Sequence, residues 1–450
     1  MNVILIAVDT LRSDHLSCYG YPRLTSPNID RLARTGVRFT EMIAPHIPTG
    51  PSFTTIHTGH DVMSHQIVTQ GGKRELAPDV RTLAELLKQA GYFTAAADNL
   101  NRHFVRGFDH YGTYTWGRDP SQPWRKGEAV TPVALDALNR CAAQDKPFFL
   151  FVHYWDPHTP FLPPAPFDRM FYEGDERAPS NRSMEPVFAS EPFVDYFKSW
   201  MGSVTDIQFP IAQYDAAIAY ADACLAHLLT RLHELKLQGD TLVVLLADHG
   251  ETMDEHAGHF DHHGLYDHNL RVPFILTCPG RLPGDTVIDG MVSTMDVAPT
   301  ILDFIGQTEV AFEERMTGRS VLPLIASTEL NGLDDALFLT ECTWMRKRGV
   351  RTRQWKYIEA LEPDFHGFAP VELYHLGEDP TEQTNLAEER PEVVRELAGR
   401  LEAWSSCRMA ETGKPNPIME QPISLRKLGP LTATVPDNQR YDPGVKAQRD

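Results

Sequence analysis

The residues of this chain that could do chemistry are two carboxylates, an imidazole and a hydroxyl. Asp9 and Asp248 each follow an apolar run typical of a buried strand, and His249 comes directly after Asp248. If the two strands are parallel neighbours, both carboxylates reach one edge of the sheet, where two like charges need a cation or a shared proton. Together with a hydroxyl they suit Mn, Zn, Fe, Mg or Ca. For either acid alone, a role at a strand end without metal is the simpler interpretation.

The hydroxyl is that of Thr49, in the turn Thr49-Gly50-Pro51-Ser52 within residues 44–59. The residues after it can start a helix, whose first backbone N–H groups favour an anion, and Gly50 lets the main chain come close to that anion. A hydroxyl placed there could attack a tetrahedral anionic ester. Taken alone, the turn could equally precede an ordinary surface helix, because glycine and proline mark turns in many proteins.

Further imidazoles follow Asp248 in a dense run made of His249, His256, His259, His262, His263 and His268. Such a loop can be merely solvated. Its place directly after the predicted ligands indicates that some of these imidazoles face the substrate and offer positive charge and a proton. The sequence does not decide among His259, His262 and His263. His158 lies in a turn after another predicted strand, and we expect His153 to be internal support.

The order of the predicted elements indicates an α/β protein with a doubly wound, mostly parallel central sheet flanked by helices. The apolar runs predict strands at 3–8, 93–97, 148–152, 241–247 and 271–278, and helices at about 27–35, 83–90, 214–235 and 295–305. A capping box, Thr82 with Glu85, begins the second of these helices. Residues 159–210 are rich in proline and aromatic residues, and we expect a lid or specificity insert there.

We predict three parts of the chain. Residues 1–335 form the catalytic α/β domain with the insert, residues 336–405 a smaller α+β subdomain with a small antiparallel sheet and a helix to about Trp404, and residues 406–450 an extended tail. The tail is punctuated by proline and weakly hydrophobic. We expect it either to wrap the surface or to reach a partner subunit in a homo-oligomer.

Composition limits the partners and the compartment. The formal net charge of −19 disfavours nucleic acid and anionic membrane, so we expect a small anionic ester as substrate, held in a locally positive pocket. The six cysteines are scattered, which favours a reducing compartment. The start of the chain has no basic segment before its short apolar run, so it predicts a buried strand rather than a signal peptide. These features together predict a cytoplasmic protein that neither spans nor binds a membrane.

Several segments resemble the sulfatase family of the alkaline phosphatase superfamily. They are VDTLRSDHLSCYGY, SPNIDRLARTGVRF, APHIPTGPSFTTIHTG, HYWDPHTPFLPP, LLADHGE, HHGLYDHNLRVPFIL, VSTMDVAPTILDFIG and ELYHLGEDPTEQTNLA. The resemblance implies an alkaline phosphatase-like fold and one divalent metal, with Mn or Zn favoured, bound by Asp9, Thr49, Asp248 and His249. It implies Thr49 as nucleophile and places His158 with His262 or His263 at the substrate. We also assign Asn99 and His259 to substrate binding.

Two departures from the family pattern bear on the reaction. The family's signature Cys or Ser, which is oxidised to formylglycine, is Thr49 here, and the signature Arg is Phe53. Threonine does not undergo that oxidation, and a threonine sulfate ester could not then be expelled by elimination, whereas water can open a phosphothreonine. Two-zinc relatives also carry Asp-x-x-x-His on the preceding helix, where this chain has Asp215 and Ala219. We therefore expect one principal metal, with a second only through the histidine-rich loop.

The sequence thus predicts a metal-dependent hydrolase of a phosphodiester or phosphonate monoester that works through a phosphothreonine on Thr49. A phosphomonoester is less favoured, because a single metal neutralises less charge on the transferred group. One alternative is a sulfatase that acts without formylglycine or an arylsulfatase-like enzyme of mixed specificity. Another is a non-catalytic metal-binding protein, which the loss of the signature Arg favours.

Overall fold

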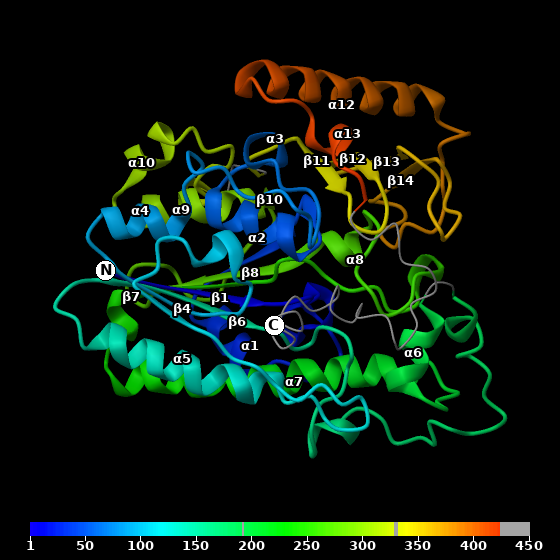
Figure 1. The fold of residues 1–450 in the computed structure, drawn as a ribbon, viewed down its shortest axis with the longest axis horizontal. Coiled ribbons are helices and arrows are strands. Elements are labelled where there is room, and N and C mark those ends of the chain that lie inside the picture. Colours follow the sequence, from blue (N-terminus) through cyan, green and yellow to red (C-terminus); the bar gives the residue numbers. More distant parts are fainter. Residues whose placement is uncertain (191–192, 328–331, 424–450) are drawn as a thin grey trace.

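The computed structural model describes residues 1–190, 193–327 and 332–423, and its centre is a nine-stranded, mostly parallel sheet (Figure 1). The strand order is β10-β2-β8-β7-β1-β6-β4-β5, with β9 beside β2. Only β8 runs antiparallel to its neighbours, β7 and β2. The strands are β1 (Asn2–Val8), β2 (Val37–Ile43), β4 (Phe93–Ala97), β5 (His110–Gly112), β6 (Phe148–Tyr154), β7 (Thr241–Leu246), β8 (Arg271–Thr277), β9 (Thr286–Ile288) and β10 (Val292–Ser293).

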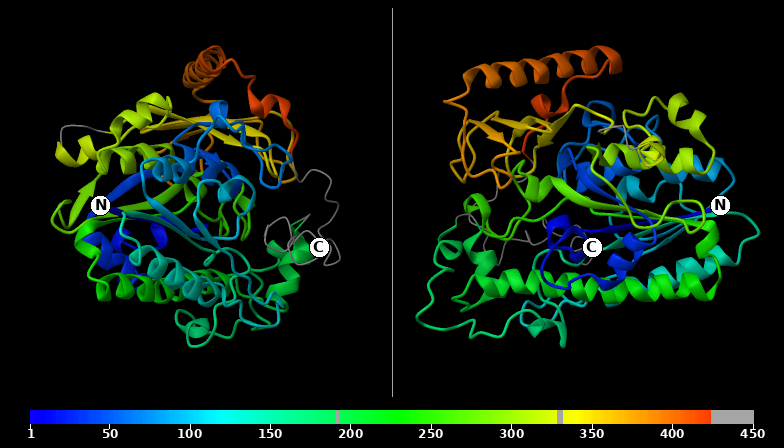
Figure 2. Two further views of the ribbon diagram at one scale, coloured as in Figure 1. Left: turned by 60° about the vertical axis from the view of Figure 1, so that its left-hand side comes forward. Right: turned by 180° about the vertical axis from the view of Figure 1, so that it is seen from behind.

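Helices cover both faces of this sheet, which confirms the predicted α/β fold (Figures 1 and 2). One face carries α1 (Pro27–Arg34), α5 (Lys126–Ala142) and α7 (Gln208–Glu234), and the other carries α2 (Thr49–Thr58), α4 (Leu83–Gln89) and α9 (Val297–Phe304). The capping box is present, with Thr82 Oγ1 accepting from the Glu85 N–H. The remaining helices are α3 (Val62–His65), α6 (Val194–Met201), α8 (Asp267–Leu270), α10 (Thr308–Glu313), α11 (Leu322–Ala326), α12 (Pro391–Thr412) and α13 (Pro417–Glu420).

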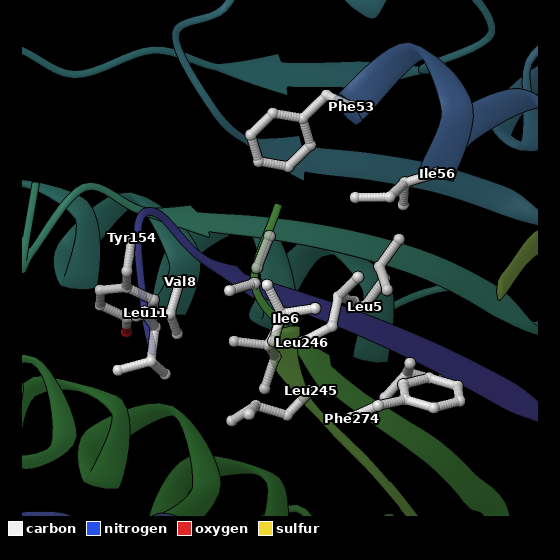
Figure 3. Close-up of a cluster of buried hydrophobic side chains, with 14 of the residues drawn as sticks. Leu5, Ile6, Val8, Leu11, Phe53, Ile56, Tyr154, Leu245, Leu246 and Phe274 are labelled. Atoms are coloured by element: carbon white, nitrogen blue, oxygen red, sulfur yellow. The ribbon is translucent and has the colours of Figure 1, made fainter. Parts of the chain in front are cut away.

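The central strand β1 is buried on both faces, because β6 and β7 flank it and helices cover it above and below. Figure 3 shows Phe53 and Ile56 of α2 over one face of the sheet, and Leu245 of the neighbouring strand β7 pointing to the opposite face. A strand buried in this way has no polar face, which explains why its sequence is continuously apolar until Asp9. The end of the strand is therefore the first place where a charged side chain can stand.

In the described part of residues 159–210, several aromatic side chains pack into the main core. Phe161 is completely buried and contacts Trp200 and Tyr214 edge-on. In the described part of this segment α6 is the only α-helix that lies wholly inside it, and α7 begins at Gln208, earlier than the predicted Tyr214. Phe193, just before α6, stacks on His263 with ring centroids 5.4 Å apart. The segment thus contacts the histidine-rich loop, and its role as a specificity insert stays a prediction.

The C-terminal sheet holds β14, β13, β12 and β11 in antiparallel order, with the short strand β3 (His46–Ile47) added at its edge, parallel to β11. These strands are β11 (Ala336–Glu341), β12 (Lys347–Thr352), β13 (Trp355–Ala360) and β14 (Val371–His375). Strand β3 ends two residues before Thr49, so it lies in the part of the chain predicted as the catalytic domain. It nevertheless pairs with the sheet of the C-terminal subdomain. The predicted domain boundaries did not include this pairing.

The prediction of an extended tail from residue 406 is wrong for its first part. Helix α12 continues past Trp404 to Thr412, where Gly413 in the left-handed conformation ends it, and α13 follows. The residues after Trp404 contain no proline until Pro415, so nothing stops the helix earlier. Residues 424–450 of the predicted tail lie outside the described residues. None of the helices in the described ranges has both the length and the apolar character of a membrane span.

Candidate metal and nucleophile site

Asp9 and Asp248 meet because their strands are parallel neighbours. Strands β1 and β7 pair in register from Asn2 with Thr241 to Ala7 with Leu246, so both chains leave the sheet at the same edge. One ligand atom each from Asp9, Asp248 and His249 lie within 4.8 Å of one another, and all three residues are completely buried. Within the described residues, this is the only group of three or more Asp, Glu, His or Cys side chains so arranged.

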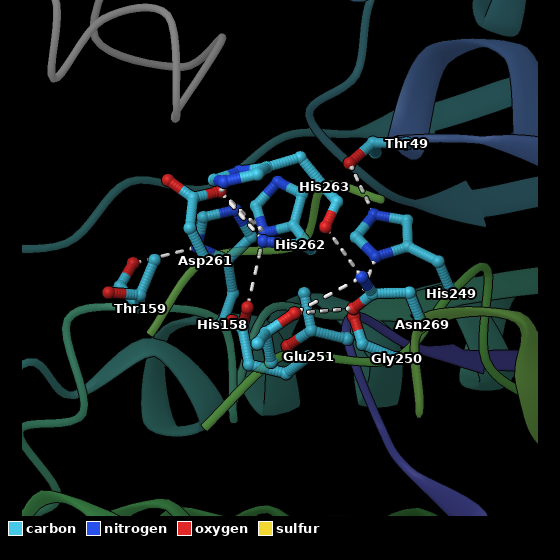
Figure 4. A network of polar contacts seen from close by, with 12 residues as sticks. Thr49, His158, Thr159, His249, Gly250, Glu251, Asp261, His262, His263 and Asn269 are labelled. Atoms are coloured by element: carbon cyan, nitrogen blue, oxygen red, sulfur yellow. Dashed lines mark hydrogen bonds and ion pairs between the residues drawn. The ribbon is translucent and has the colours of Figure 1, made fainter. Parts of the chain in front are cut away.

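Thr49 is the first residue of α2, and its hydroxyl points to this group (Figure 4). Its Oγ1 lies 3.1 Å from Nε2 of His249. One turn further along α2, the Ser52 hydroxyl donates to the backbone carbonyl of Asp248 at 2.6 Å. This bond ties the start of the helix to the end of β7, so the nucleophile candidate and the ligand candidates form one rigid unit.

The contacts of His249 define which nitrogen is available. Its Nδ1–H donates to the carbonyl of Gly250 at 2.9 Å, so Nε2 carries the lone pair and accepts from the Thr49 hydroxyl. Burial lowers the pKa of His249 to about 3, which keeps the imidazole neutral, as a metal ligand must be. Gly250 itself is required, because a Cβ there would lie 1.9 Å from the carbonyl oxygen of His268.

Asp9 belongs to a buried chain of charges. His153 donates from Nε2 to Asp9 Oδ2 at 3.1 Å and from Nδ1 to Asp98 Oδ1 at 2.9 Å. Burial opposes its charge, but these two carboxylates raise the pKa of His153 to about 9. The expectation that His153 is internal support agrees with these contacts, since both ring nitrogens are already used.

Two oxygen atoms at the sheet edge fit a cation. Oδ1 of Asp9 and Oδ2 of Asp248 are buried and have no hydrogen-bond partner in the described part of the chain. Burial, with the charge of Asp248, raises the pKa of Asp9, and burial raises that of Asp248 to about 6. Buried carboxylate oxygens without a donor are costly unless an ion binds them. The donor set therefore fits a divalent metal.

Of the two adjacent histidines, His262 lies at this group. Its ring centroid is 4.6 Å from that of His249 and 5.0 Å from that of His158. His263 is also buried, but its Nδ1 lies 3.6 Å from Asp261 Oδ1 and its Nε2 lies 2.5 Å from Nε2 of His366 in the C-terminal subdomain. The structure thus brings His158 and His262 to the sheet edge and gives His263 a different neighbourhood.

Two carboxylates that the sequence analysis did not select surround His262. Its Nδ1 lies 3.4 Å from Asp261 Oδ1 and 3.6 Å from Glu251 Oε1. Although burial lowers it, these neighbours raise the pKa of His262 to about 10, whereas burial and His262 lower that of His158 well below its usual value. The two imidazoles are therefore held in opposite charge states. Glu251 could have been found, since it directly follows the Asp248-His249-Gly250 run.

Asn99 and His259, the other two residues predicted to bind substrate, form no hydrogen bonds with the candidate metal ligands in the described part of the chain. The side-chain oxygen of Asn99 accepts from the Trp155 indole at 2.6 Å, and its amide donates to the Tyr114 carbonyl at 3.3 Å, so both ends are engaged. His259 is buried, and burial together with His263 lowers its pKa to about 4. No hydrogen bond joins either residue to Asp9, Asp248 or His249 within the described residues.

Asp215, which stands where two-zinc relatives carry a ligand, is occupied by protein partners. It accepts from Tyr21 at 2.7 Å and from Arg23 at 2.6 Å, and His15 Nδ1 lies 2.6 Å away. These contacts satisfy both of its oxygens without an ion. They agree with the expectation of one principal metal.

The sequence of this chain matches a known protein family. The family described as Sulfatase matches residues 1–307, and the C-terminal region of N-sulphoglucosamine sulphohydrolase matches residues 254–406. N-acetylglucosamine-6-O-sulfatase of Bacteroides thetaiotaomicron is 25% identical, over 86% of this chain and 82% of the relative. The multifunctional alkaline phosphatase superfamily protein PehA of Trinickia caryophylli is 26% identical, over 90% of this chain and 95% of the relative.

A solved structure shares the fold. The phosphonate monoester hydrolase of Agrobacterium radiobacter superposes with a TM-score of 0.72 at 23% identity, covering 90% of this chain and 96% of that one. The resemblance stated from the motifs is confirmed, since the matched family spans well over half of the chain. This protein belongs to the sulfatase family of the alkaline phosphatase superfamily.

Proposed function

We propose that this protein is a metal-dependent hydrolase of a phosphodiester or phosphonate monoester, with Thr49 as its nucleophile. The observation that supports this most directly is the position of the Thr49 hydroxyl, at the N-terminus of α2 and 3.1 Å from His249 Nε2. The helix N-terminus favours an anionic group in front of that hydroxyl. Threonine is not converted to formylglycine, so a sulfate ester of Thr49 could not be expelled by elimination. A phosphothreonine, which water can open, is therefore the intermediate that we favour.

Asp9, Asp248 and His249, with the Thr49 oxygen, would hold the metal. Their donor atoms are close together, and two buried oxygens have no other partner in the described chain. A bound divalent ion would lower the pKa of the threonine hydroxyl and polarise a nonbridging oxygen of the ester. Oxygen and imidazole ligands suit Mn or Zn, the metals we favour.

The residues of the chain then divide the proton transfers. The Thr49 hydroxyl gives its proton to solvent, its oxygen attacks phosphorus, the bond to the leaving alcohol breaks, and His262 gives that alcohol oxygen its proton. Water next attacks the phosphothreonine, the bond from phosphorus to the Thr49 oxygen breaks, and His158 receives a proton from the water. His158 then passes this proton to solvent, and His262 regains a proton from solvent. Nδ1 of His158 donates to the Thr159 carbonyl at 2.7 Å, so its buried Nε2 is the nitrogen that can accept. The opposite charge states of the two imidazoles support this division.

A sulfatase that works without formylglycine is the second candidate, and the relatives support it equally. The names of the matched proteins include a sulfatase of N-acetylglucosamine esters as well as a phosphonate monoester hydrolase. Phe53 in place of the signature Arg packs on His153 with ring centroids 4.7 Å apart, so this position adds no charge to the site. A site with fewer fixed cations is also what a non-catalytic relative would show.

The test compares ester classes and looks for the covalent intermediate. The full chain, loaded with Mn or Zn, is assayed on bis-nitrophenyl phosphate, a nitrophenyl phosphonate and nitrophenyl sulfate, and quenched samples are analysed by intact mass and peptide mapping. We expect turnover of the phosphorus esters and a phosphoryl adduct on Thr49. The variant Thr49→Ala should lose both, while Thr58→Ala, at the other end of α2, should keep both. Faster turnover of the sulfate would favour the sulfatase, and activity of Thr49→Ala equal to wild type would overturn the nucleophile.

A further inference from the structure

Lys126, the first residue of α5, is a charged side chain in the interior of the protein. It is 2% exposed and ranks among the largest fully buried side chains. Lysine is almost never fully buried unless it is paired, because its charge loses the stabilisation of water. Lys126 follows Arg125 in an ordinary polar stretch, so the sequence carries no sign of its burial.

The contacts of Lys126 converge on the turn that carries His158. Its Nζ donates to the backbone carbonyl of His158 and lies 3.5 Å from Asp156 Oδ1. The other oxygen of Asp156 accepts from the backbone N–H of Gly127 at 2.7 Å. The start of α5 and the end of β6 are thus joined at three points, all within the turn from Trp155 to His158.

This turn fixes the direction of the His158 ring. The backbone N–H of His158 donates to the Trp155 carbonyl at 2.8 Å, and its Nδ1 donates to the Thr159 carbonyl at 2.7 Å. The remaining nitrogen, Nε2, is buried without a hydrogen-bond partner in the described residues, and the ring centroid lies 5.0 Å from that of His262. Small rotations of the turn would therefore move the one nitrogen that can act.

We propose that Lys126, together with Asp156, is a positioning residue that aims His158 at the reacting group. The inference rests on the proposed function, since it assigns Lys126 to the same site. A buried ion pair is weak support for stability, because well-packed apolar residues can replace such a pair at little or no cost. Lys126 also donates a hydrogen bond to the backbone carbonyl of His158, and an apolar residue could not make this bond.

A double-mutant cycle tests whether Lys126 acts through His158. The variant Lys126→Met leaves the charge of Asp156 without its cation, so the combined variant Lys126→Met with Asp156→Asn is used. It keeps the interior neutral and leaves an acceptor for the Gly127 N–H, and it should stay folded at the assay temperature. We expect it to lose about 10- to 100-fold in kcat with little change in KM. In a His158→Ala background the same two changes should cost almost nothing further, because interacting residues are non-additive. Additive losses, or no loss in the first background, would overturn the proposal.

A second readout separates this inference from the proposed function. Proton–nitrogen spectra of the imidazoles, assigned by comparison with His158→Ala, report which nitrogen of His158 is protonated, whether or not any ester is turned over. We expect the Nδ1–H form in the wild type and a mixture in the combined variant, with the exposed control Lys146→Met unchanged. An altered spectrum in a protein without esterase activity would leave the positioning role intact and reject the function. An unaltered spectrum in an active enzyme would do the reverse.

Discussion

Two buried charged clusters of this protein differ in whether their charges are balanced. At the edge of the central sheet, Asp9 and Asp248 face each other with a neutral His249 between them. In the cluster that joins α8 to the C-terminal sheet, Asp267 accepts from Arg351 Nη2 at 2.8 Å and from Lys356 Nζ at 2.5 Å. Asp9 and Asp248 are completely buried, and Asp267 is 14% exposed. Among the described residues, the cation bonded to Asp9 is His153, which Asp98 shares, whereas two cations pair with Asp267.

The difference shows in the acidity of the carboxyl groups. Burial and Asp248 raise the pKa of Asp9, whereas Arg351 and Lys356 hold that of Asp267 well below its usual range even though burial opposes them. A satisfied cluster is complete as it stands, and removing one of its members leaves a buried charge without a partner. An unsatisfied one in a folded protein indicates that a ligand supplies the missing charge. Breaking each cluster in turn should therefore affect different properties.

The largest effect is expected from Asp9→Asn. It removes a ligand candidate and should lower kcat/KM by about 10⁴-fold, equivalent to about 5.5 kcal/mol in the barrier. The metal-free protein should lose little stability, because the change relieves repulsion from Asp248 and His153 keeps its bond to Asp98. Metal content by elemental analysis, and Tm with and without added Mn, measure both effects. A metal-free variant much less stable than the wild type would show that the carboxylate is structural.

The variant Lys356→Met should behave in the opposite way. It leaves Asp267 and Glu382, both ion-paired with Lys356 at 2.5 and 2.7 Å, without that cation, and should cost about 3–5 kcal/mol of the free energy of unfolding. Urea unfolding of the metal-free chain measures the loss. The metal stoichiometry should stay at the wild-type value. If metal binding disappeared while the fold persisted, the two clusters would not be independent.

The adjacent histidines offer a finer comparison. His262→Gln should lower kcat by about 10²-fold, because His262 contacts the unsatisfied cluster and is assigned the proton transfer. His263→Gln, which removes the contact with His366, should cost less than about 10-fold. Steady-state rates on one activated and one less activated ester measure both, and the loss for His262→Gln should be larger on the second ester. Equal losses for the two variants would reject the assignment.

The smallest effect concerns a partly exposed ion pair beside the site. Arg12 Nη1 lies 2.7 Å from Glu255 Oε1 and, although burial opposes it, lowers the pKa of Glu255 to about 2. Because the folded pKa lies below the ordinary value of 4.5, the pair stabilises the protein above that pH and loses this contribution as the pH falls toward 2. Between pH 5 and 3, wild type should lose about 1 kcal/mol more than Glu255→Gln in urea unfolding. Parallel curves for the two proteins would show that the pair contributes nothing.

Much of the fold was predictable because its strands are buried on both faces. Continuous apolar runs such as Val3–Val8 and Thr241–Ala247 leave few alternatives, and the observed strands β1 and β7 differ from them by a residue at an end. The end of α12 was predicted too early, since no residue between Trp404 and Gly413 either stops or requires a helix. The pairing of β3 with β11 was not predictable, because two residues carry no periodicity.

For the site, the sequence by itself determined the chemical groups. It set Asp9 and Asp248 at strand ends, placed His249 beside one of them, and put Thr49 where a helix begins, and the structure brings these four together. Their catalytic roles stay predictions. The positions of these groups were predictable from short stretches of sequence. A carboxylate that directly follows a buried parallel strand lies at the carboxyl edge of the sheet, where ligands bind in open α/β folds.

Only the tertiary structure decided which of His262 and His263 lies at the sheet edge. It also decided that Lys126 contacts the main chain of His158 and that Glu251 lies beside the His262 ring. Neighbouring residues of an extended segment point to opposite sides, so a shift of one residue in the loop would exchange the two histidines. That choice depends on contacts with segments far away in the chain, such as the subdomain loop with His366. Such long-range packing leaves no periodic signal in the sequence.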